Sequence, residues 1–78
     1  MANNAINLNV IEENASEWVN QGNATKKGKT ISIDLKKMGY DKLLGTGVPS
    51  LAYNITISAA SAKAVEKVEA AGGEIING

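Results

Sequence analysis

The chain has 78 residues, enough for one domain at most, and its eight lysines balance eight acidic residues. It contains no arginine, histidine or cysteine, which excludes disulfides, zinc ribbons and nucleophilic triads that need an imidazole. We therefore expect a cofactor-free protein that is not an enzyme. No apolar run approaches the roughly 18 residues that a membrane span needs, so no membrane association is expected.

The N-terminal third predicts a strand followed by a helix. Ile6, Leu8 and Val10 alternate with polar residues, which favours a short opening strand. Apolar residues then recur at three- and four-residue spacing, which predicts one helix face made of Val10, Ile11, Ala15, Trp18 and Val19. Gly22 suits a left-handed helix end. Residues 25–29 are interpreted as a polar turn that carries three lysines.

The middle third contains the clearest half-buried strand, residues 30–35, in which apolar and polar side chains alternate. Residues 36–40 are predicted to form a bend, and residues 42–44 are a short apolar run. That run ends at the glycine loop, which we define as Gly45-Thr46-Gly47.

The C-terminal third predicts a second alternating strand over residues 51–59 and a helix capped by Ser61. The helical stripe consists of Ala64, Val65, Val68 and Ala71, and Gly72-Gly73 ends it before a closing strand at residues 74–76.

The whole pattern predicts an α/β fold in one globular domain, residues 1–78. Its order is β-α-β-β-β-α-β, with two helices packed on a small mixed sheet. The residues expected to be buried together, with Trp18 packed against them, are Ile31, Ile33, Leu35, Ile55, Ile57, Val65 and Val68.

The glycine loop lacks the further residues of a nucleotide-binding motif, because a valine, a proline and then a strand follow it. Two interpretations stay open. The loop is a tight turn that needs glycine, or its backbone amides approach a phosphate of RNA.

The lysines also allow two interpretations. Lys36, Lys37 and Lys42 bracket the bend before the glycine loop, and the acids offer no convincing catalytic pair. The lysines either keep the surface soluble or form a small edge that contacts phosphates without reading bases.

Two segments resemble a known family. Residues 39–47 read GYDKLLGTG, and residues 61–73 read SAKAVEKVEAAGG. In this order they resemble the C-terminal globular domain of the L-fifteen family of large-subunit ribosomal proteins, in its archaeal and eukaryotic branch. The resemblance covers roughly residues 6–76.

The resemblance implies a structural protein of the cytoplasmic ribosome that binds large-subunit ribosomal RNA and neighbouring ribosomal proteins. Members of that family carry a long basic N-terminal arm, so we interpret residues 1–78 as a fragment without it, monomeric when isolated. Thr46 stands where the family often has a lysine, and we expect weak RNA binding by this domain alone. The candidate RNA-binding residues are Lys36, Lys37, Lys42, Gly45, Thr46, Gly47, Lys63 and Lys67.

The alternative is a stand-alone protein-interaction module that shares the fold and uses an exposed strand edge or helix face. A basic arm encoded directly upstream of Met1 would favour the ribosomal interpretation.

Overall fold

The computed structural model describes residues 4–77, which form two helices and seven strands. In chain order these are β1 (Ala5–Asn7), α1 (Leu8–Gln21), β2 (Ala24–Lys27), β3 (Thr30–Asp34), β4 (Lys42–Leu44), β5 (Ala52–Ile57), β6 (Ala59–Ala60), α2 (Ala62–Ala70) and β7 (Glu74–Asn77).

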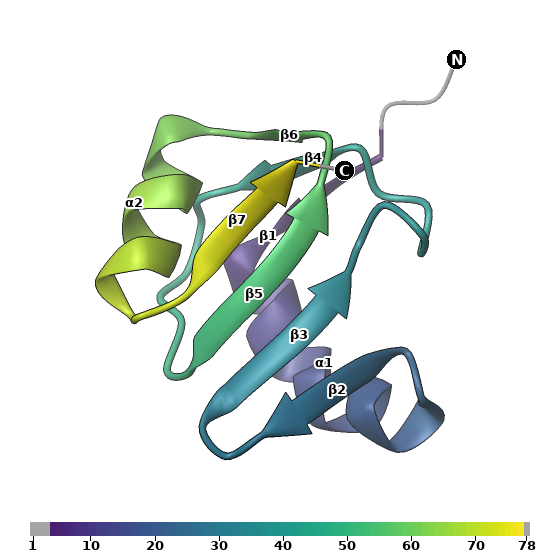
Figure 1. Ribbon diagram of the computed structural model, residues 1–78. Coiled ribbons are helices and arrows are strands. Elements are labelled where there is room, and N and C mark those ends of the chain that lie inside the picture. The colour runs from purple at the N-terminus through teal and green to yellow at the C-terminus, as the bar shows by residue number, and fades with distance from the viewer. Residues whose placement is uncertain (1–3, 78) are drawn as a thin grey trace.

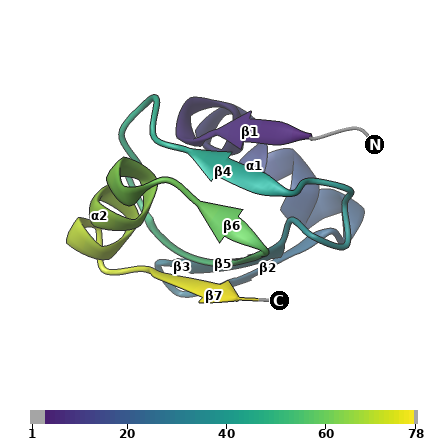
Figure 2. The ribbon, with the colours of Figure 1, turned by 90° about the horizontal axis from the view of Figure 1, so that it is seen from above.

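The strands are divided between two sheets (Figure 1). One sheet has the order β1-β4-β6, and all its pairs are parallel. The other has the order β2-β3-β5-β7, with β2 and β3 antiparallel and the remaining pairs parallel. Both helices lie on the same side of this larger sheet, and no helix of residues 4–77 covers its other side (Figure 2). The α/β class is confirmed, and the predicted elements occur in the predicted order, with β2 and β6 as two further strands.

The structure has two sheets in place of the predicted single mixed sheet, because one extended segment contributes a strand to each sheet. The segment expected as a strand over residues 51–59 divides at Ser58 into β5, which pairs with β3, and β6, which pairs with β4. A run of alternating residues shows that the chain is extended, but it does not show where the chain changes partners.

The prediction of a polar turn over residues 25–29 is wrong for most of that segment. Residues Ala24–Lys27 form β2, which pairs with β3 as a hairpin, and Gly28 makes the turn with a φ of 60°. Three of the four residues of β2 are exposed at the edge of the sheet, so this strand lacks the alternation of apolar residues that marks a half-buried strand.

The helix ends follow local sequence signals, with one shift at the start. The first helix begins at Leu8, two residues earlier than expected. Leu8 is buried, but as the first residue of α1 and not as part of β1. Gly22 ends α1 in the left-handed conformation with a φ of 83°. The Ser61 hydroxyl accepts a hydrogen bond from the Ala64 amide at 3.2 Å and caps α2 as predicted.

The core confirms six of the seven residues predicted to be buried. Val65 is the exception and is only partly buried, because Ala64 and Val68 form the buried stripe of the short helix α2. Trp18 packs against the core from α1, as predicted. The residues of the buried hydrophobic core are Ile6, Leu8, Ile11, Ala15, Ala24, Ile31, Ile33, Leu35, Leu43, Tyr53, Ile55, Ile57, Ala64 and Val68.

Candidate functional site

The eight candidate residues lie at the two ends of β4 and do not form one cluster. The glycine loop follows β4 and lies beside α2, whereas the turn of residues 36–40 precedes β4 and lies at the opposite end of the strand (Figure 2). Lys63 and Lys67 therefore accompany the glycine loop. Lys36 and Lys37 lie near the start of β4, where Lys42 is exposed.

Both glycines of the loop are packed against helix backbone. A Cβ atom added at Gly45 would lie 2.9 Å from the Lys63 Cβ and 3.0 Å from the Ala64 nitrogen, at the start of α2. A Cβ at Gly47 would lie 2.6 Å from the Asn9 nitrogen, in the first turn of α1, and Gly47 has a φ of 108°. The loop is therefore wedged between the N-terminal ends of the two helices, and glycine is required at both positions.

Both backbone groups of Thr46 are hydrogen-bonded within the protein. The Asn9 amide donates to the Thr46 carbonyl oxygen at 2.9 Å, and the Thr46 amide donates to the Asn7 side-chain oxygen at 3.3 Å. The interpretation in which the loop amides approach a phosphate of RNA requires the Thr46 amide to point outward. Instead it is bonded to Asn7, while the Thr46 side chain remains exposed.

Lys67 holds the loop from the side of α2. Its ammonium group donates to the Gly45 carbonyl oxygen at 2.6 Å and to the Gly47 carbonyl oxygen at 2.8 Å. Lys63 lies one helical turn earlier on α2 and is exposed. The two candidate lysines of α2 therefore occupy different environments.

The turn before β4 is held by its own backbone and by the Asn4 side chain, which donates to the Gly39 carbonyl oxygen at 2.9 Å. The amides of Met38 and Tyr40 both donate to the Leu35 carbonyl oxygen, and the Lys37 amide donates to the Asp34 carboxylate at 3.0 Å. Lys36 and Lys37 are exposed here.

Sequence reasoning missed a network around Glu12. Its carboxylate accepts hydrogen bonds from the Ser50 amide at 2.8 Å, the Ser50 hydroxyl at 2.7 Å and the Tyr53 hydroxyl at 2.6 Å. Burial raises the pKa of Glu12, but the hydrogen bonds from Tyr53 and Ser50 outweigh burial and lower the pKa below 4.5. Burial and the Glu12 carboxylate raise the pKa of Tyr53. One signal was available, because a buried tyrosine hydroxyl usually has a hydrogen-bond partner.

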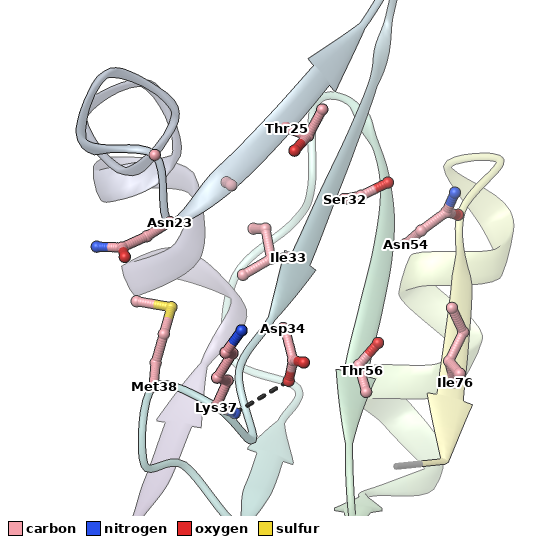
Figure 3. A pocket seen from close by; sticks show the side chains of 12 residues that line it. Asn23, Thr25, Ser32, Ile33, Asp34, Lys37, Met38, Asn54, Thr56 and Ile76 are labelled. Atoms are coloured by element: carbon pink, nitrogen blue, oxygen red, sulfur yellow. Dashed lines mark hydrogen bonds between the residues drawn. The ribbon is translucent and has the colours of Figure 1, made fainter.

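The uncovered side of the larger sheet carries a shallow hollow of about 730 Å³ (Figure 3). Its lining from β3 and β5 is polar and includes Ser32, Asn54 and Thr56, while Asp34 and Lys37 bring one charge of each sign. Because Asp34 offsets Lys37 there, the hollow offers a phosphate less attraction than Lys36, Lys42 and Lys63 do.

Neither helix among residues 4–77 is long and apolar enough to cross a membrane. Over the same residues, no three acidic side chains come together as a metal ion would require.

Comparison with known proteins gives a consistent result. Residues 5–76 match the family model described as ribosomal proteins 50S-L15, 50S-L18e and the 60S protein L-twenty-seven-A. The chain is 41% identical over 73 residues to large ribosomal subunit protein uL15 of Methanobrevibacter smithii, covering 94% of this chain and 50% of that protein. It is 38% identical over 71 residues to uL15 of Archaeoglobus fulgidus, covering 91% of this chain and 40% of that protein.

A third relative, uL15 of Hyperthermus butylicus, is 35% identical over 71 residues, covering 91% of this chain and 47% of that protein. The chain thus spans about half the length of the relatives it matches, or less.

Proposed function

The chain belongs to the family of ribosomal proteins that includes 50S-L15 and 50S-L18e, and from that premise we propose that it is a structural component of the large ribosomal subunit that binds large-subunit ribosomal RNA. Members of this family build the ribosome and are not enzymes. The proposal includes contact with neighbouring ribosomal proteins and a location on the cytoplasmic ribosome. It also treats residues 1–78 as one domain of a longer protein.

The observation that carries the RNA-binding proposal is the arrangement around β4. The protein has no net charge, yet four exposed lysines are found at the two ends of this one short strand and its flanking elements: Lys36, Lys37, Lys42 and Lys63. Lysines placed on such rigid elements contact phosphates as point charges and fix the orientation of a protein on folded RNA.

The glycine loop gives the proposed RNA-binding surface a fixed shape. Because Gly45 packs against Lys63 on α2 and Gly47 packs against Asn9 on α1, the exposed Thr46 between them is held at a defined position. A surface of fixed shape with flanking positive charge suits RNA that is recognised by its backbone and not by its bases.

The test is charge reversal at Lys42, with Lys27→Glu as the matched control. Lys27 is an exposed lysine at the end of β2, outside the proposed contact residues. Binding of each variant to deproteinised large-subunit ribosomal RNA is measured at about 50 and about 200 mM salt. We expect Lys42→Glu to bind more weakly and to reduce the salt slope by about one unit or more, while Lys27→Glu changes neither beyond its effect on net charge.

Equal losses for Lys42→Glu and Lys27→Glu would overturn the site, because binding would then follow net charge alone. Unchanged RNA binding by a folded Lys42→Glu protein would remove Lys42 from the contact residues.

A further inference from the structure

We propose that Lys67 is a positioning residue: its ammonium group holds the glycine loop in the shape that meets RNA, and does not itself contact the RNA. The inference rests on the proposed function, because RNA is what the loop is held to meet. It changes the role given to Lys67 by sequence reasoning, which placed this lysine among the direct contacts.

The first argument is the hydrogen bonding of the ammonium group. A lysine ammonium has three donors. Two of them are taken by the carbonyl oxygens of Gly45 and Gly47, at 2.6 and 2.8 Å, in a part-buried position. Hydrogen bonds from a charged donor are shorter and stronger than neutral ones, so a phosphate would have to compete with two good acceptors already in place.

The second argument is the shape of the loop itself. The carbonyl groups of Gly45 and Gly47 converge on one point, and two converging carbonyl oxygens repel unless a donor lies between them. Both residues are glycines whose added Cβ would collide with a helix, so the loop cannot relax toward either helix. A cation at that point relieves the repulsion, and Lys67 supplies it.

The third argument is that two different side chains anchor the two ends of the connection from β4 to β5. Lys67 of α2 binds the first part, at Gly45 and Gly47, and Glu12 of α1 binds the last part, at Ser50. Thr46 lies between the two carbonyl groups that Lys67 binds, and Val48 lies between Gly47 and Ser50. Both residues are exposed, Val48 to 75%. Lys67 therefore controls the geometry of the exposed Thr46 without adding a free charge there.

The test of the holding role needs no RNA. In Lys67→Met the side chain keeps its length and loses its donors, and Lys63→Met is the matched control because Lys63 lies one turn earlier on the same helix. Hydrogen exchange is followed at the amides of Asn9 and Thr46, whose hydrogen bonds join the loop to the start of α1.

We expect exchange at these two amides to be at least about tenfold faster in Lys67→Met, and unchanged in Lys63→Met. The Ser50 amide, held by Glu12, is the internal reference and should change little. Equal acceleration at all three amides would mean a general loss of stability, and no acceleration would mean that Lys67 does not hold the loop. Either result overturns the inference.

The test against RNA uses the salt dependence of binding to deproteinised large-subunit ribosomal RNA. A lysine that contacts a phosphate changes the salt slope by about one unit when it is removed, whereas a lysine that acts only through the loop changes affinity and leaves the slope alone. We expect Lys67→Met to bind about three- to tenfold more weakly with the wild-type slope, and Lys63→Met to lower the slope. A slope lowered equally by both variants would make Lys67 a direct contact.

The two measurements separate the two proposals. If the Lys63 and Lys42 variants bind RNA as the wild type does, the proposed site fails, whatever the exchange rates show. If those variants lose binding while Lys67→Met changes neither loop exchange nor affinity, the site stands and the positioning role of Lys67 fails.

Discussion

The two connections that flank β4 both contain glycine, but they are held in different ways. The glycine loop is fixed by side chains from outside it, those of Lys67 on α2 and of Asn7 just before α1. The turn before β4 is fixed by hydrogen bonds within its own backbone and by one that the Asn4 side chain donates to the Gly39 carbonyl oxygen. A Cβ added at Gly39 would meet no atom of residues 4–77 within 4 Å. In one connection glycine is required by contacts with the rest of the protein, and in the other by the local backbone angle alone.

This difference teaches what glycine can signal in a sequence. Gly39 has a φ of 97° and Gly47 a φ of 108°, so both take the left-handed region that other residues avoid. At Gly39 a side chain would add strain. At Gly47 it would add strain and also displace the backbone of α1 near Asn9.

The largest expected effect is therefore the difference between Gly47→Ala and Gly39→Ala. We expect Gly39→Ala to lower the free energy of unfolding by about 1–2 kcal/mol, the cost of a left-handed alanine. Gly47→Ala should cost about 3 kcal/mol or more, because the backbone must also move. Urea unfolding of the two variants measures this, and equal costs would contradict the distinction between the two connections.

The next effect concerns the second anchor of the β4–β5 connection. Glu12→Gln keeps the shape of the side chain and removes the charge that accepts three hydrogen bonds from Ser50 and Tyr53. We expect a loss of about 1–2 kcal/mol, allowing for partial exposure to solvent. Glu13→Gln is the matched control, since Glu13 is the exposed neighbour on the same helix and should change stability little.

The pH dependence of stability tests the role of the Glu12 charge more directly than the substitution alone. The folded protein lowers the pKa of Glu12 below 4.5, so its carboxylate stabilises the fold at pH values above 4.5. This stabilisation is lost as the pH falls below 4.5 and through the lowered pKa. The difference in unfolding free energy between the wild type and Glu12→Gln should shrink across that window. A difference that stays constant with pH would mean that the charge of Glu12 is not what matters.

The smallest expected effect on stability is at the lysines of the turn before β4. Lys36→Ala and Lys37→Ala replace exposed side chains for which no hydrogen bond of the side-chain nitrogen is seen within residues 4–77. Each should change the free energy of unfolding by no more than about 0.5 kcal/mol. Thermal unfolding tests this, and a larger loss would show that the side chains of Lys36 and Lys37 help to hold the turn.

Much of the fold could be predicted because its pattern is periodic. The strand at residues 30–35 and the two helices follow from alternation and from three- and four-residue spacing. The strand β2 was missed because it is an exposed edge with two lysines, and β6 was not separated from β5 because it has only two residues. Periodicity reports burial on one face, and neither strand has a buried face long enough to repeat.

Less of the candidate site could be predicted, because its contacts join distant parts of the chain. Lys36 and Lys37 are close to the glycine loop in sequence, yet they lie at the other end of β4. Lys67 is far from the loop in sequence and touches it. Spacing along the chain does not reveal such tertiary pairs, and the assignment of these residues to RNA binding remains a prediction.

The register of the parallel strands has a consequence for how fast the protein folds. Ala5 pairs with Lys42, Thr30 with Ala52 and Asn54 with Glu74, so long stretches of chain must close before these ladders exist. Within residues 4–77 the β2–β3 hairpin is the strand pair closed by a tight turn. Closing long stretches costs entropy before any contact compensates for it, so refolding should take roughly milliseconds to seconds and not microseconds. The fluorescence of Trp18, which packs against the core from α1, makes that rate directly measurable.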